Sequence, residues 1–205
     1  MPIVTGIDSA RTRRELSAAG QTVAAATERL RQDPADRALD TSGMPASLEA
    51  RHPARTSTQE SFGRALLRLG EIPEIGERIV TMSPDVATST HLAGWINKSG
   101  VFSRQQEQDF ESGAKRMLRW QPSPEGQHIE LGISELNLFM ALGQFGLAGE
   151  LTGQPLVPIG TVYDPFVCRG LDALIYGLYI DARFVFAGTP AGVSLSPEGG
   201  AHQST

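Results

Sequence analysis

One carboxylate in this sequence lies in the first turn of a predicted apolar helix. Glu135 follows a short run of strand-forming residues and a glycine, and the predicted helix after it is apolar almost all round, so we expect this helix to be buried. An acid in the first turn of a helix is stabilised by the helix dipole by about 0.3–1 kcal/mol. The same acid could instead meet a ligand, because open α/β sheets bind ligands where strands turn into helices. Spacing alone leaves both interpretations open.

Other residues with possible chemistry also follow predicted strands. Asp85 comes just after the apolar run 78–82, where it either binds a ligand or caps the turn 86–90. Tyr163 and Phe166 follow the run 156–162, where their rings either face a ligand or pack at the sheet edge. His202 lies in a glycine-rich terminal stretch, and by itself such a histidine is expected to be exposed and without a role.

Several classes of site are not supported by any motif. There is no glycine-rich loop ending in Gly-Lys-Ser/Thr, no Gly-x-Gly-x-x-Gly and no Gly-x-Ser-x-Gly. Four histidines and one cysteine show no zinc-ligand spacing, and His128 is expected to be a structural residue at the start of a strand. Nucleotidase, hydrolase and metalloenzyme functions therefore have no sequence support, and no metal ligand is predicted in this chain.

Composition limits the partners and the compartment. The 205 residues carry a net charge of −5, and their 18 basic residues are scattered, so nucleic-acid binding is not expected. Cys168 is the single cysteine, which excludes an internal disulfide and suits a reducing cytoplasm. The first residues lack a signal-peptide pattern, and no uncharged apolar window of about 18 residues exists, so we expect no membrane segment.

Hydrophobic periodicity predicts strands that alternate with helices. The pattern favours an α/β fold, a parallel sheet with helices on both faces. We expect a helical arm and linker over 1–54 and the α/β domain over 55–205. Because the chain stops within a polar glycine-rich stretch, we expect it to be a portion of a longer protein, with an incomplete domain. The predicted helices are 8–32, 57–70, one that follows Gly132, and 167–180; the predicted strands are 78–82, 128–131, 156–162 and 183–187; 91–120 is expected to be loop-like.

Four stretches together resemble one family. The chain is similar to the pyrimidine-binding domain of the transketolase superfamily, and looks closest to the homodimeric decarboxylating first component of pyruvate dehydrogenase. The tail 197–202 also resembles that component's histidine loop, in which Glu-Gly-x-x-His recurs. The resemblance covers about residues 55–205. The four stretches are Ser57–Leu66, Met82–Thr90, Gly132–Leu136 and Tyr163–Asp172.

The resemblance implies a thiamine diphosphate site. Glu135 matches the glutamate that bonds the protonated ring nitrogen of the cofactor's aminopyrimidine, and Phe166 matches the aromatic residue that stacks on this ring. Tyr163 lies beside the ring, Asp85 matches an acidic position near the cofactor, and the Ile133 backbone would face the pyrimidine. His202 matches a histidine used for substrate binding or proton transfer. The cofactor would store the electrons released when a 2-oxo acid, pyruvate by resemblance, loses carbon dioxide.

The family motif for the cofactor diphosphate and Mg²⁺, Gly-Asp-Gly followed by an asparagine, is absent. In the family this motif belongs to another domain, which meets the pyrimidine domain across a homodimer interface. The resemblance therefore implies half of a split site, and the full-length enzyme would hand its product to a lipoyl acyltransferase component. Two alternatives stay open: part of a transketolase-type sugar-phosphate transferase, or a non-catalytic α/β domain in which Glu135 only stabilises its helix.

Overall fold

The computed structural model describes residues 17–18, 20–21, 24–25, 28, 39, 41–48, 55–104, 120 and 122–189. These residues divide into two units. One contains the described positions before Leu39 together with 148–155, and the other contains the remaining described residues. In the first unit, every described position of the predicted helix 8–32 is helical, and α6 spans Ala148–Thr152. The boundary expected between residues 54 and 55 stays a prediction.

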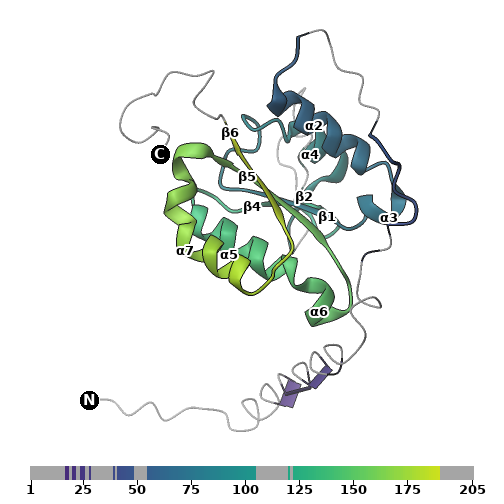
Figure 1. The fold of residues 1–205 in the computed structure, drawn as a ribbon, viewed down its shortest axis with the longest axis vertical. Coiled ribbons are helices and arrows are strands. Elements are labelled where there is room, and N and C mark those ends of the chain that lie inside the picture. Colours follow the sequence, from purple (N-terminus) through teal and green to yellow (C-terminus); the bar gives the residue numbers. More distant parts are fainter. Residues whose placement is uncertain are drawn as a thin grey trace. The chain divides into compact units, whose positions relative to one another are not determined.

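A six-stranded sheet lies at the centre of the second unit (Figure 1), and its paired strands are parallel, as the sequence predicts. The strand order is β3-β2-β4-β1-β5-β6. β1 is central, and its Met82 lies opposite Ile129 of β4 and Gly160 of β5. The carboxyl ends of these three strands therefore share one edge of the sheet, where ligands bind in such folds. The strands are β1 (Ile79–Ser83), β2 (Val101–Phe102), β3 (Pro122–Ser123), β4 (His128–Glu130), β5 (Val157–Tyr163) and β6 (Val185–Thr189).

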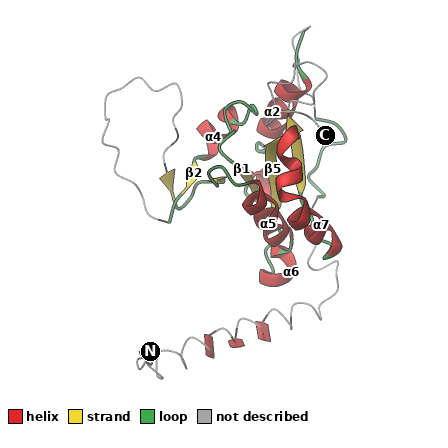
Figure 2. Cartoon of the chain, turned by 90° about the vertical axis from the view of Figure 1, so that its left-hand side faces the viewer, coloured by secondary structure: helices red, strands yellow, loops and turns green. Residues whose placement is uncertain are grey.

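Helices cover both faces of the sheet, which confirms the predicted fold class. Strand residues alternate between two cores: Ile79 and Ile159 join one, while Met82 and Val162 join the other. Helices α5 and α7 pack side by side over the second core (Figure 2). The first core lies under α2 (Thr58–Leu69), α3 (Pro73–Gly76) and α4 (Ala93–Ser99), and the second under α5 (Glu135–Gly146) and α7 (Leu171–Tyr179).

A glycine in the sheet lets α5 lie close to it. A Cβ added to Gly160 would be 2.7 Å from Cδ1 of Leu142 and 3.1 Å from Cδ1 of Leu138. Both leucines are fully buried. A side chain at position 160 would therefore push α5 away from β5, and with it Glu135 at the start of the helix.

Two expectations are corrected by the structure. The stretch 91–120 is not wholly loop-like, because it contains α4 and β2. Leu92, Trp95 and Ile96 have helical spacing and are buried, but the helix is too short for its period to stand out. Helix α5 is not buried all round: Leu138, Phe139 and Leu142 face the core, whereas its other face is exposed.

Candidate functional site

Glu135 is the first residue of α5, and it is only 6% exposed. Between the end of β4 and this helix, the chain turns through Gly132, whose φ of 65° suits glycine. The helix is already capped by Ser134, whose hydroxyl oxygen accepts a hydrogen bond of 3.4 Å from the backbone N–H of Asn137. Because Ser134 provides the cap, capping does not explain a buried carboxylate at Glu135, which costs free energy unless a partner compensates its charge.

The 3₁₀ helix η2 (Asp164–Gly170) brings a second group of side chains to Glu135. It follows β5, which ends at Tyr163. Gly170 at its end approaches α5 so closely that an added Cβ would lie 2.7 Å from the Glu135 carbonyl oxygen and 2.4 Å from the Phe139 ring. The absence of a side chain at Gly170 thus allows η2 to contact the first turn of α5.

Within η2, Arg169 approaches this carboxylate and also contacts the Phe166 ring. The Arg169 guanidinium lies 3.8 Å from the centroid of the Phe166 ring, and its Nη1 is 3.7 Å from Oε1 of Glu135. The Tyr163 and Phe166 rings are tilted, with centroids 6.1 Å apart. The structure therefore links Glu135 to Phe166 through Arg169, which the sequence analysis missed, and places Tyr163 beside Phe166. The spacing of three residues between Phe166 and Arg169, one turn of a 3₁₀ helix, was the available signal.

Asp85 lies in the loop after β1, at the same edge of the sheet. Its φ is 63°, which is uncommon for a residue with a side chain, and its backbone N–H donates a 2.7 Å hydrogen bond to Oε1 of Glu130. The Val86 backbone N–H donates a 3.1 Å hydrogen bond to the Ser83 hydroxyl oxygen, and the turn 86–90 is closed by a 3.0 Å hydrogen bond from the Thr90 backbone N–H to the Val86 carbonyl oxygen. Neither hydrogen bond uses the Asp85 side chain.

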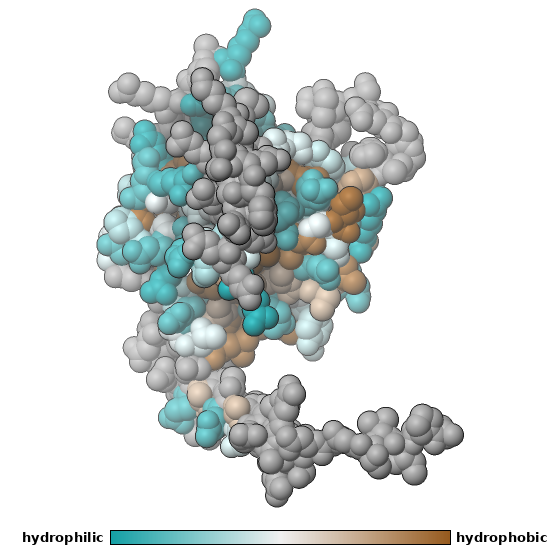
Figure 3. Space-filling model, turned by 180° about the vertical axis from the view of Figure 1, so that it is seen from behind, coloured by the Kyte–Doolittle hydropathy of each residue, from teal (hydrophilic) through white to brown (hydrophobic). Residues whose placement is uncertain are grey.

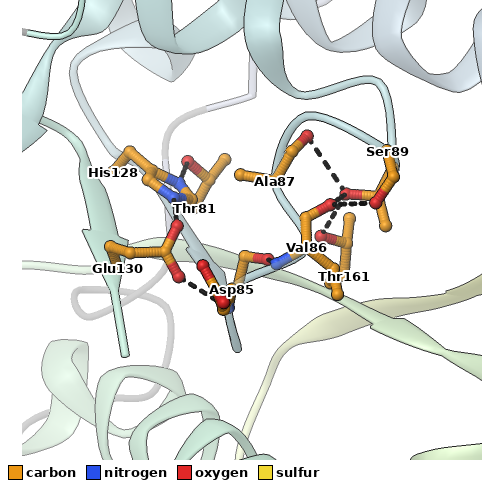
Figure 4. Close-up of polar contacts among 10 residues, drawn as sticks. Thr81, Asp85, Val86, Ala87, Ser89, His128, Glu130 and Thr161 are labelled. Atoms are coloured by element: carbon orange, nitrogen blue, oxygen red, sulfur yellow. Dashed lines mark hydrogen bonds and ion pairs between the residues drawn. The ribbon is translucent and has the colours of Figure 1, made fainter. Parts of the chain in front are cut away.

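The side chain of a buried histidine lies next to Glu130 (Figure 4). His128 is fully buried, its Nδ1 shares a 2.9 Å hydrogen bond with the Thr81 hydroxyl, and its Nε2 lies 3.4 Å from Oε2 of Glu130. His128 is therefore a structural residue at the start of β4, as the sequence predicts. A series of hydrogen bonds therefore runs from Thr81 through His128 and Glu130 to the Asp85 backbone, and it holds the loop to the end of β4.

The same loop is also tied to β5. The Tyr163 hydroxyl donates a 2.5 Å hydrogen bond to the Ser89 hydroxyl oxygen, and the Thr90 and Thr161 hydroxyls hydrogen-bond at 2.9 Å. An open pocket of about 220 Å³ lies beside the loop, lined by Asp85–Ser89, Trp120 and Glu130. The loop that contains Asp85 is thus tied to Tyr163 through Ser89, while Asp85 itself is hydrogen-bonded to Glu130.

Two further predicted residues have different outcomes. Ile133 lies in the turn before α5 and is 78% exposed, next to Glu135 in the chain but with its side chain open to solvent. His202 and the histidine-loop resemblance at 197–202 lie outside the described residues, so the structure gives them no position.

An exposed group of apolar side chains on α5 and α7 borders the site. We call it the α5/α7 apolar face. The view of the molecule from behind shows hydrophobic residues, coloured brown, at the surface (Figure 3). Such a grouping on a protein surface commonly marks an interaction site. The face consists of Leu136 and Met140 on α5 and of Leu171, Ile175, Tyr176, Leu178 and Tyr179 on α7, all exposed.

Two features are absent from the residues that the structure describes. Among them, no three His, Cys, Asp or Glu side chains come together as a metal site would require. In the same part of the chain, no helix combines the length and hydrophobicity of a membrane-crossing segment.

Comparison with known proteins gives a consistent relationship in sequence. No family model matches the chain. It is 24% identical over 163 residues to the pyruvate dehydrogenase E1 component of Pseudomonas aeruginosa, covering 78% of this chain and 18% of that protein. The E1 component of Haemophilus influenzae is 24% identical over 153 residues, covering 74% of this chain and 17% of the relative. The chain thus spans less than a fifth of the length of these relatives.

Solved structures share the fold. Transketolase from Leishmania mexicana superposes with a TM-score of 0.54 at 21% identity, covering 95% of this chain and 24% of that one. Transketolase from Campylobacter jejuni gives a TM-score of 0.53 at 16% identity, with 86% and 22% covered. The chain is therefore similar in sequence to one part of the pyruvate dehydrogenase E1 component, and it has the α/β fold found in transketolases.

Proposed function

We propose that this chain provides the aminopyrimidine-binding half of a thiamine diphosphate site in a 2-oxo acid dehydrogenase. One observation carries the proposal: Glu135 is a buried carboxylate at the start of an apolar helix, with the aromatic ring of Phe166 close to its ion-pair partner. The relatives named pyruvate dehydrogenase E1 component favour this family of reactions.

The described residues fit the aminopyrimidine ring chemically. A buried carboxylate needs a positive or hydrogen-bonding partner, and the protonated ring nitrogen of an aminopyrimidine is one. Phe166 offers a flat apolar surface on which such a ring could stack. Tyr163 borders this surface, and its hydroxyl is held by Ser89. Glu135 would orient the ring and hold the proton on its nitrogen, while Phe166 would shield that contact from water.

The cofactor would supply the chemistry that no side chain provides. Thiamine diphosphate, when bound, provides a carbon nucleophile that adds to the carbonyl of a 2-oxo acid and accepts the electrons released by decarboxylation. Asp85 and the Ile133 backbone are proposed to complete the contacts to the ring. His202 is proposed to bind substrate or transfer a proton.

The other half of the site is proposed to come from a different domain, which binds the diphosphate through Mg²⁺. The α5/α7 apolar face supports this division, because it exposes Leu136 and Leu171 beside the residues of the ring site. Covering such a face with another domain would remove apolar surface from water and exclude water from Glu135. In the full-length protein we propose a homodimer that brings the two domains together.

The proposed substrate rests on the relatives' names, and the proposed later partner rests on the family resemblance. Pyruvate is the proposed 2-oxo acid, and a lipoyl acyltransferase component the proposed acceptor of the product. The proposed location is the cytoplasm, where the exposed thiol of Cys168 would stay reduced. A transketolase-type transferase is the alternative, since two transketolases share the fold.

The test is a titration of the 205-residue chain with thiamine diphosphate and Mg²⁺, followed by NMR. A half-site should bind weakly and turn over no oxo acid, and Glu135→Gln should weaken that binding further. Glu60→Gln is the matched control, because Glu60 is also an acid in the first turn of a serine-capped helix. Equal binding by the Glu135→Gln variant and the parent would contradict the role of Glu135. Micromolar binding measured by calorimetry, or oxo-acid-dependent dye reduction, would contradict the half-site.

A further inference from the structure

Arg169 makes two contacts that the proposed cofactor ring would need. Its guanidinium lies 3.8 Å from the centroid of the Phe166 ring, and its Nη1 lies 3.7 Å from Oε1 of Glu135. The 3₁₀ geometry of η2 sets this arrangement, since residues three apart lie one above the other in such a helix. One planar cation thus occupies both the stacking surface and the carboxylate.

A guanidinium and a protonated aminopyrimidine share the properties that matter at this position. Both are flat and positively charged, and both carry N–H groups that donate to a carboxylate. Either can lie over the face of an aromatic ring. The two groups would therefore compete for Glu135 and for the same face of Phe166.

Building on the proposed function, we propose that Arg169 occupies the place of the aminopyrimidine ring and must swing out before the ring binds. Arg169 thereby sets the affinity of the half-site. In the free chain it compensates the charge of Glu135, so that the carboxylate is not left alone in an apolar setting. A ring that replaces it has to bring a positive charge of its own, which favours an aminopyrimidine over a neutral aromatic ring.

Two features allow Arg169 to leave. Its side chain is 47% exposed, so its guanidinium can move into solvent without disturbing a core. Its ion pair is also long: the pair between Arg64 and Glu60 has a nitrogen–oxygen distance of 2.8 Å, against 3.7 Å here. The attraction between two charges weakens with distance, so a bound ring that brings its own positive charge closer to Glu135 offsets the loss of this ion pair.

The experiment uses the isolated pyrimidine moiety, 4-amino-5-hydroxymethyl-2-methylpyrimidine, as the probe. It is titrated into the ¹⁵N-labelled 205-residue chain, and the Kd is taken from NMR shift changes. Arg169→Ala should bind the probe about three- to tenfold more tightly than the parent, the size expected when two weak contacts no longer compete. Arg169→Lys keeps the charge but has no planar group, so its Kd should lie between the two.

Matched controls separate the two proposals. Arg68→Ala removes another exposed arginine, which lies on α2 and forms a 2.8 Å ion pair with Glu71. This change should leave the Kd unchanged. Equal or weaker binding by Arg169→Ala, while Glu135→Gln still weakens binding in the parent, would overturn the inference and leave the proposed function standing. If Glu135→Gln changes the Kd in neither background, the proposed function fails and the inference fails with it.

Discussion

Two helices of this chain begin with the same local chemistry, but their first-turn acids lie in different environments. Helix α2 is capped by Ser57, and the side chain of Glu60 lies in its first turn. Helix α5 is capped by Ser134, with Glu135 in its first turn. In both, the serine oxygen accepts a hydrogen bond from a backbone N–H three residues later. Capping rules therefore describe both starts equally well.

The surroundings of the two acids separate them. Glu60 faces solvent and accepts a 2.8 Å hydrogen bond from Arg64, which lowers the pKa of its carboxyl group. Glu135 is buried, and its nearest cation, Arg169, belongs to another element and lies 3.7 Å away. An acid that helps only its own helix needs no burial. The contrast shows that placement by distant segments, rather than capping, makes Glu135 a candidate for function.

The largest expected effect is on stability, and it comes from disturbing the close approach of η2 to α5. Gly170→Ala should lower the free energy of unfolding by about 2–3 kcal/mol, because its Cβ would overlap the Phe139 ring and the Glu135 carbonyl oxygen. Urea unfolding measures the change. Gly20→Ala is the control, since a Cβ at this helical position meets no atom within 4 Å and should be neutral or stabilising. Equal stability of Gly170→Ala and the parent would contradict the contact.

A third carboxylate, Glu130, accepts a hydrogen bond from the backbone, and replacing it tests whether this hydrogen bond stabilises the edge of the sheet. Glu130→Ala should cost about 1–2 kcal/mol and speed amide hydrogen exchange at Asp85, because the Asp85 N–H loses its acceptor. Glu130→Gln keeps an oxygen acceptor and should restore most of the protection. Unchanged exchange at Asp85 in Glu130→Ala would show that the loop is held by Ser83 and Ser89 alone.

Replacing Glu135 by leucine should separate stability from function. The loss of a buried charge should leave the fold as stable as before or more stable by about 1 kcal/mol, since the remaining Arg169 is half exposed and needs no partner. Binding of the pyrimidine probe should disappear. Glu60→Leu, by contrast, should not change probe binding. A marked loss of stability in Glu135→Leu would indicate that the acid is structural.

The smallest effect concerns the pH dependence of Glu60. Hydrogen bonding to Arg64 lowers the folded-state pKa below the ordinary value of 4.5, so this contact stabilises the fold above that pH and is lost as the pH falls through the lowered value. The stability difference between the parent and Glu60→Gln should therefore be small at pH 7 and should vanish in strong acid. Thermal unfolding at both pH values measures it. A difference that grows on acidification would have the wrong sign.

The sequence by itself determined most of the elements and the position of the main acid. Helical and strand periods, the serine caps and the glycine turn depend on neighbouring residues, so β1, β4, α5 and β5 could be predicted together with the parallel sheet. The place of Glu135 in the first turn followed from the same local rules. The resemblance of the chain to a thiamine diphosphate-binding domain could also be found without a structure, because four short stretches of sequence carry it.

Only the tertiary structure decided which side chains meet. Arg169 reaches Glu135 because Gly170 lets η2 approach α5, and Glu130 holds Asp85 because β4 pairs with β1. Likewise, the sequence pattern of α5 is apolar almost all round, so it did not reveal that one face of this helix is exposed. Such contacts join residues tens of positions apart in the chain, and local propensity carries no information about them. They arise from strand order, helix approach and burial, which only the folded chain defines.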